Sequence, residues 1–289
     1  MAVFNSDVIA YFSILRPINY KIFLLIFGIL IVFQTYAVSL VENDKTTELD
    51  TVVFTISFLS PAIAFSAAFF VYRRYRDSRV FGRSYLALFL AFLMIFLGEV
   101  TYFVYEDVLK VDPYPSIADV FFFAFYLLVL YHIRMNIKSF YSKLSKRKTI
   151  GVVGALSVIV IVIYVILLLL NVSGSDEDIN NIVGNNIFSS YGYMNILFSF
   201  DVLYGIAFVA ASAATFWYSV IGIVAFRRGA LETVWIILVA GISLLTLGDA
   251  IYFHTEVLGE YTFDHYVNLL WYAGYMVIVY ALYKHAKAV

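Results

Sequence analysis

The chain has 289 residues, of which 63% are hydrophobic and 13% are charged, and its mean hydropathy is +0.90. A soluble domain of this length could not carry so much apolar surface, so the composition predicts an integral membrane protein. The chain has no cysteine, which excludes disulfides, thiolate metal sites, cysteine nucleophiles and covalently attached c-type haem.

Eight stretches of roughly 20 mostly apolar residues follow one another, each long enough to cross a bilayer as a helix. They lie near residues 22–40, 51–72, 84–105, 116–137, 149–171, 200–226, 233–254 and 265–284. Their lengths predict an all-α polytopic membrane protein rather than a β-barrel. The preceding segment, 1–21, is too polar to span, and we expect a short helix at the membrane interface there.

Lysine and arginine fall on one side of the predicted bundle. Seventeen of the 19 lie in the N-terminal segment and in the second, fourth, sixth and C-terminal connections, whereas acidic residues gather in the other connections. By the positive-inside rule, the sequence predicts a multi-pass protein of the cell membrane with both termini cytoplasmic. Its partners would be the lipid bilayer and, at the basic inner loops, a possible cytoplasmic protein.

The pattern of the third and fourth spans returns in the seventh and eighth. The segment Leu97-Gly98-Glu99, with Tyr102, Phe103 and Glu106, recurs 150 positions later as Leu247-Gly248-Asp249, with Tyr252, Phe253 and Glu256. Asp119, Tyr126 and Tyr131 recur 149 positions later as Asn268, Tyr275 and Tyr280. The sequence thus predicts a first four-helix repeat over 22–140, a basic linker over 141–148 and a second repeat over 149–289. Because each repeat has an even number of spans, the copies should be parallel, related by a pseudo-twofold axis along the membrane normal.

The repeated polar residues lie near the predicted outer ends of their helices. Glu99, Tyr102 and Glu106 share one helix face, and Asp249, Tyr252 and Glu256 repeat that spacing. Since a carboxylate within a span is costly and normally faces a partner, a cavity or an ion path, we predict an outward-facing site between the repeats for an external ligand, ion or proton. Its candidate residues are Glu99, Tyr102, Asp119, Tyr126, Asp201, Asp249, Tyr252, Asn268, Trp271 and Tyr275.

A structural interpretation of the same residues is also open. Glu99 and Asp249 would then be struts, protonated or bonded to tyrosines, that fix the packing of the helices. Asp119 would sit in the first turn of a helix capped by Ser116, where a carboxylate favours the positive end of the helix dipole.

Two groups of motifs resemble a known kind of membrane region. They are Gly248-Asp249, Tyr252, Gly259, Trp271, Gly274-Tyr275 and Ala281-Leu282, and Pro113-Tyr114-Pro115-Ser116, Ala118-Asp119 and Tyr126. They look like the duplicated multi-span region that precedes GGDEF, EAL and histidine-kinase output domains in bacterial signalling proteins. The resemblance covers mainly 97–132 and 247–285, and departs where Glu99 replaces Asp and Asn268 replaces an acid. It implies a sensory role, with signalling to a separate partner because no output domain follows His285.

Other classes of function have partial support. His254, Glu256 and His265 could hold a divalent metal, although an exposed acidic loop also explains them. Asp201 and Asp249 would suit an intramembrane aspartyl protease, but the first glycine of a GxGD motif and a Pro-Ala-Leu motif are absent. A transporter would need polar groups deeper in the spans, and the inner halves hold almost none beyond their basic ends. No retinal lysine, phosphate loop or nucleic-acid module is indicated, and the sequence does not identify a cofactor.

Overall fold

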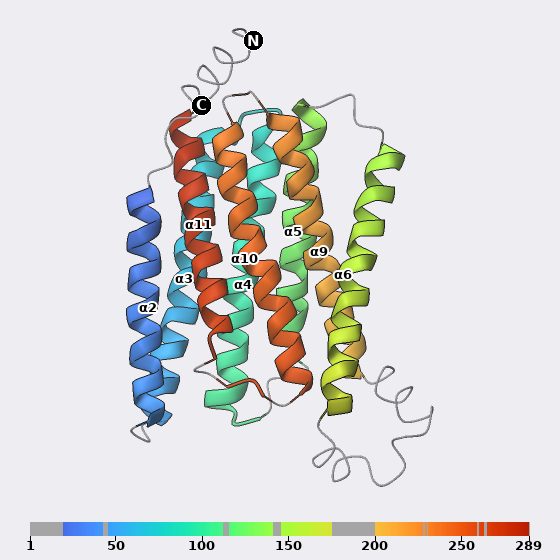
Figure 1. Ribbon diagram of the computed structural model, residues 1–289. Helices are drawn as coiled ribbons and strands as arrows, with labels where there is room; N and C mark the ends of the chain where they lie inside the picture. The colour runs from blue at the N-terminus through green and yellow to red at the C-terminus, as the bar shows by residue number, and fades with distance from the viewer. Residues whose placement is uncertain are drawn as a thin grey trace, which may run out of the picture.

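The structure is a computed structural model that describes residues 20–42, 46–111, 116–140, 146–174, 200–227, 229, 231–258, 260–262 and 265–288. Within these ranges the chain forms long helices that run side by side, and no strand (Figure 1). They are α2 (Tyr20–Glu42), α3 (Thr46–Tyr75), α4 (Phe81–Phe103), the π-helical turn η1 (Val104–Val108), α5 (Ile117–Phe140), α6 (Lys146–Gly174), α9 (Phe200–Phe226), α10 (Glu232–Val257) and α11 (Val267–Ala288).

Each predicted span corresponds to one of these helices. Most of the helices extend a few residues beyond the predicted bounds at one end or both, because charged and polar residues continue their first and last turns outside the apolar run. Helix α9 has the predicted bounds, and α11 begins two residues later than predicted. The basic stretch predicted as a linker ends inside a helix, since α6 begins at Lys146. The predicted interfacial segment falls almost entirely on residues 1–19, outside the described part of the chain.

Seven of the helices, α2 to α6, α9 and α10, are long and apolar enough to cross a membrane. Their outward faces carry large apolar side chains, such as Val32, which is 70% exposed on α2, and Leu170, which is 62% exposed on α6. Because such surfaces are unfavourable in water, the chain is a multi-pass membrane protein whose outer faces contact lipid. The eighth predicted span is α11, which is less apolar because it carries Asn268, Lys284 and several tyrosines.

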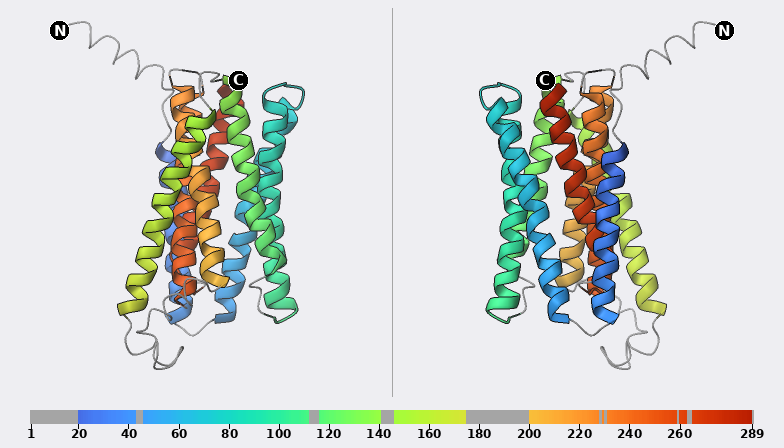
Figure 2. Two further views of the ribbon diagram at one scale, coloured as in Figure 1. Left: turned by 90° about the vertical axis from the view of Figure 1, so that its right-hand side faces the viewer. Right: turned by 90° about the vertical axis from the view of Figure 1, so that its left-hand side faces the viewer.

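Six helices form a closed ring, in which α3 contacts α4, α4 contacts α5, α5 contacts α9, α9 contacts α10, α10 contacts α11 and α11 returns to α3. Helix α2 packs outside the ring against α3 and α11, and α6 packs outside it against α9 (Figures 1 and 2). Helix α2 begins, and α11 ends, at the same end of the bundle (Figure 1). We call this the basic end, because Arg73 and Arg74 close α3 there and Lys287 closes α11.

The basic end contains a buried polar cluster. Ser84 Oγ lies 2.8 Å from His132 Nδ1, and Asn136 Nδ2 donates to Ser84 Oγ over 2.7 Å. His285, which is 2% exposed, lies beside them among the rings of Tyr75, Phe81 and Tyr85. We expected almost no polar residue in the inner halves of the spans beyond their basic ends, and this cluster lies at that end. Ser84 comes from α4, His132 and Asn136 come from α5, and His285 comes from α11, so the cluster forms only when the fold brings these three helices together.

Candidate functional site

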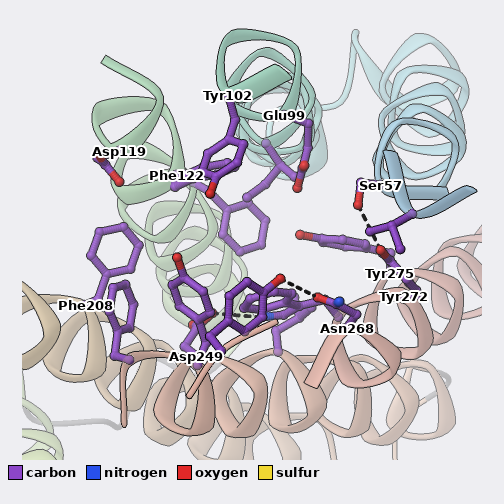
Figure 3. A pocket seen from close by; sticks show the side chains of 18 of the residues that line it. Ser57, Glu99, Tyr102, Asp119, Phe122, Phe208, Asp249, Asn268, Tyr272 and Tyr275 are labelled. Carbon is purple, nitrogen blue, oxygen red and sulfur yellow. Dashed lines mark hydrogen bonds between the residues drawn. The ribbon is translucent and has the colours of Figure 1, made fainter. Parts of the chain in front are cut away.

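A cavity of about 130 Å³ lies inside the ring, and Figure 3 shows it from close by. Its lining residues place it in the half of the bundle away from the basic end. All six ring helices contribute side chains to its wall, from Ser57 on α3 to Phe208 on α9. An engineered cavity of about 150 Å³ is large enough for benzene, so this one has room for one small molecule or a few waters.

Nine of the ten candidate residues line this cavity. They come from α4 (Glu99, Tyr102), α5 (Asp119, Tyr126), α10 (Asp249, Tyr252) and α11 (Asn268, Trp271, Tyr275). The tenth, Asp201, is the second residue of α9, but its side chain lies outside the described part of the structure. Figure 3 shows Glu99 and Tyr102 on one wall and Asp249 on the opposite wall.

Asp249 is held by donors on both of its oxygens. The Tyr126 hydroxyl donates to one oxygen, and the Trp271 Nε1–H donates to the other over 3.0 Å. Asp249 is 7% exposed, so these two bonds replace the water that a buried acceptor would lose. Because they connect α10 to α5 and to α11, Asp249 ties three ring helices together.

Glu99 differs from Asp249 in its partners. Within the described residues, no hydrogen bond or ion pair reaches its carboxyl. Four tyrosines of the site, Tyr102, Tyr261, Tyr272 and Tyr275, lie within electrostatic range of it instead. Glu99 thus presents an acceptor to the cavity that the described side chains do not use.

Glu99 and Asp249 each follow a glycine against which an aromatic ring packs closely. A Cβ atom on Gly98 would lie 2.5 Å from Cε1 of Phe122, and one on Gly248 would lie 2.7 Å from Nε1 of Trp271. No larger residue fits at either position without moving the ring. Phe122 and Trp271 are themselves 149 positions apart, which is the offset of the predicted repeat. Phenylalanine has no N–H to donate, which is one reason why Glu99 lacks the partner that Asp249 has.

The capping role predicted for Ser116 and Asp119 is confirmed. Ser116 Oγ accepts the N–H of Ala118 over 3.1 Å, and Asp119 Oδ2 accepts the N–H of Ser116 over 2.6 Å. This reciprocal pair satisfies two backbone donors at the start of α5. Asp119 therefore both takes part in the N-terminal cap of α5 and lines the cavity.

Three polar lining residues were not foreseen from the sequence. Ser57 Oγ lies 2.8 Å from the Tyr272 hydroxyl, and the Tyr261 hydroxyl donates to Asn268 Oδ1 over 3.1 Å. Tyr261 lies in the connection after α10, where burial raises the pKa of its hydroxyl and keeps it protonated as a donor. Ser57 and Tyr272 are 215 positions apart and meet only because α3 and α11 are neighbours in the ring.

The residues proposed for a metal lie away from the cavity lining. In the described residues, no group of three or more His, Asp or Glu side chains is arranged to hold a metal ion. His265 Nδ1 instead accepts the N–H of Val267 at the start of α11 over 3.2 Å. Glu106 and Glu256 are also outside the cavity lining. Glu106 was predicted to share a helix face with Glu99 and Tyr102, on the assumption of a regular α-helix. The π-helical turn Val104–Val108 has more residues per turn, so Glu106 points in a different direction.

No family model, curated protein or solved structure matches this chain. The chemistry of the site therefore rests on its own lining, which offers three carboxyls, phenol hydroxyls and many aromatic rings. Tyr102, Tyr252 and Tyr275 line the cavity, and their hydroxyls make no hydrogen bond with the described residues. Such a lining suits the binding of a small polar molecule.

Proposed function

We propose that this protein is a sensory or ligand-binding membrane module, with a site between two repeats that opens to the outer side and signals to a separate cytoplasmic partner. The observation that carries the proposal is that the two acids, Glu99 and Asp249, line one cavity but differ in their hydrogen bonds. Asp249 has donors on both oxygens, whereas Glu99 offers its carboxyl to the cavity. Two structural struts would both be bonded to their neighbours.

The neighbour relations of the helices support a duplication into parallel halves. If α3, α4 and α5 correspond to α9, α10 and α11, a twofold axis exchanges the contact between α3 and α11 with that between α9 and α5, and both contacts exist. The capping bonds agree, because the N–H of Ala118 bonds to Ser116 and the N–H of Val267, 149 positions later, bonds to His265. Helix α11 then crosses the membrane as the counterpart of α5.

An apolar layer between the cavity and the basic end favours binding over transport. Phe92, Ile242 and Ile278 lie there and are at most 2% exposed. A continuous path for an ion would need polar groups through this layer. The cavity is therefore a closed-ended site, and its occupation would act through the packing of the ring.

A signal requires that the ligand bind one arrangement of the ring better than another. The cavity lies where α3, α4 and α5 meet α9, α10 and α11, so an occupant that contacts Glu99 on α4 and Tyr252 on α10 touches both halves. A change in the spacing of these helices would move their ends at the basic end. The arginines of the connection between α3 and α4 would present that change to the partner.

The orientation predicts which connections are accessible from outside. Val111, 49% exposed after η1, and Asp77, exposed after α3, lie at opposite ends of the bundle. In intact cells, a thiol reagent that does not cross the membrane should label Val111→Cys, and it should label Asp77→Cys only after the membrane is made permeable. Because the chain has no cysteine, the protein without either substitution should not react with the reagent and serves as the control for background labelling. Labelling of Asp77→Cys in intact cells would reverse the orientation.

Access to the cavity tests the proposed site itself. Ser57→Cys, in the cavity wall, should react with a small impermeant thiol reagent from outside, whereas Ser84→Cys, in the polar cluster near the basic end, should not. Both replacements exchange a hydroxyl for a thiol of similar size, which makes them matched. Protection of Ser57→Cys from both sides of the membrane would show a sealed cavity and would refute an external ligand site.

A further inference from the structure

We infer that the ligand of this cavity is a small organic ammonium ion, bound by the carboxyl of Glu99 and surrounded by aromatic rings. The inference rests on the proposed function and narrows it to a class of compound. Four features of the cavity support it: its charge, the open acceptor at Glu99, its aromatic wall and its size.

All the charged side chains around the cavity are acidic and favour a positively charged ligand. Three lining residues are acidic, Glu99, Asp119 and Asp249, and none is lysine, arginine or histidine. Inside a membrane protein the surroundings screen charges poorly, so an anion would meet strong repulsion there and a cation would be attracted. A neutral compound would leave an acidic carboxyl without a counter-charge.

The three acids are not equally available. Asp249 accepts from Tyr126 and Trp271, and Asp119 accepts the backbone N–H of Ser116 at the helix start. Glu99 accepts no hydrogen bond from the described residues, and Figure 3 shows its carboxyl directed into the cavity. Burying an ionised carboxyl without a partner is costly, so a bound cation would relieve this cost at Glu99.

Aromatic rings form most of the remaining wall. Tyr252 packs edge-on against Tyr261, with ring centroids 4.8 Å apart at 85°, and lies 5.3 Å from the ring of Trp271. Tyr102 and Phe122 lie on the wall near Glu99 (Figure 3). Rings at such angles expose faces as well as edges to one space. The faces of tyrosine and tryptophan attract ammonium groups, and several rings around one cation form the aromatic cage that binds quaternary ammonium ligands.

The volume of the cavity and the arrangement of its side chains favour an organic cation over a metal ion as the ligand. A cavity of about 130 Å³ is close to the volume that holds benzene, so an occupant of about six to ten non-hydrogen atoms fits. Calcium would need six to eight oxygen ligands around one point. The described residues do not provide even three acidic or histidine groups arranged for a metal.

Binding to the purified full-length protein in nanodiscs tests the inference with a matched pair of probes. Choline carries a quaternary ammonium, and 3,3-dimethylbutan-1-ol has the same shape with carbon in place of the charged nitrogen. We expect choline or tetramethylammonium to bind and to protect Ser57→Cys from the thiol reagent, and the neutral alcohol to do so at least about 10-fold more weakly. Equal binding of the two probes, or binding of neither, would overturn the inference.

Variants assign the binding to named side chains. Glu99→Gln keeps the shape and removes the charge, and it should weaken choline binding about 10- to 100-fold. Glu106→Gln, the same change on the same helical stretch but outside the cavity lining, is the control and should bind normally. Tyr252→Leu should weaken binding about 5- to 30-fold through the loss of a ring face.

The failures of the inference and of the proposed function are distinguishable. Unchanged choline affinity in Glu99→Gln, or preference for the alcohol, would overturn the ammonium class while Ser57→Cys still reacts from outside. A Ser57→Cys thiol that no reagent reaches would instead overturn the proposed function, on which the inference depends.

Discussion

Asp249→Ala is expected to lower the free energy of unfolding by about 1–3 kcal/mol, whereas Glu99→Ala is expected to leave it unchanged or to raise it. Removing the Asp249 carboxyl leaves the Tyr126 hydroxyl and the Trp271 N–H without their acceptor inside the bundle. Each unsatisfied donor costs about 1–3 kcal/mol in a soluble protein, but hydrogen bonds between membrane helices average nearer 0.6 kcal/mol. Two such bonds, with the connection of three helices that they provide, give the expected range.

Glu99 has no corresponding bonds to lose. Its removal abolishes the cost of holding a partly buried carboxyl without a partner, so the folded state should become no less stable. Reversible unfolding of both variants in mixed micelles, followed by circular dichroism in the same detergent, compares them directly. Equal destabilisation of the two would mean that both acids are structural struts, and the argument for a ligand at Glu99 would lose its basis.

The helices were predictable because each apolar run is long and ends in charged residues. The run predicted over 22–40 is the helix Tyr20–Glu42, and the run over 116–137 is Ile117–Phe140. In a bilayer the backbone has no water to bond, so an apolar run of this length must be helical. The same constraint does not say which helices are neighbours, and the ring that joins α3 to α11 and α5 to α9 could not be read from the chain.

The site was partly predictable for a different reason. Because the pattern occurs twice, residues at equivalent positions in the two copies were expected to lie at one depth, and nine of the ten candidates line one cavity. Phe122 could have been found in the same way, since it lies 149 positions before Trp271. Ser57 could not, because its bond to Tyr272 depends on the contact between α3 and α11. The difference between Glu99 and Asp249 also needs the structure, since it depends on which rings carry a donor.

Gly241→Ala is expected to cost about 1–3 kcal/mol, a large effect for one added methyl group. Helices α10 and α11 approach closely where Gly241 faces Gly274. A Cβ on Gly241 would lie 2.5 Å from Cγ1 of Ile278 and 3.0 Å from the carbonyl oxygen of Gly274, and a Cβ on Gly274 would lie 3.1 Å from the carbonyl oxygen of Gly241. The Ile278 side chain can move slightly, but the backbone oxygen can move only with its helix.

Gly154→Ala is the matched control, because it makes the same change within α6 at a position where a Cβ meets nothing within 4 Å. There the replacement should be neutral or stabilising by about 0.5–1 kcal/mol, since alanine loses less backbone entropy in a helix. Thermal unfolding should therefore move in opposite directions for the two variants. Moving α11 away from α10 would also carry Trp271 away from Asp249, so Gly241→Ala should weaken choline binding as well as stability. If both variants behaved alike, α10 and α11 would have room to separate, and the bond from Trp271 to Asp249 would not depend on their close approach.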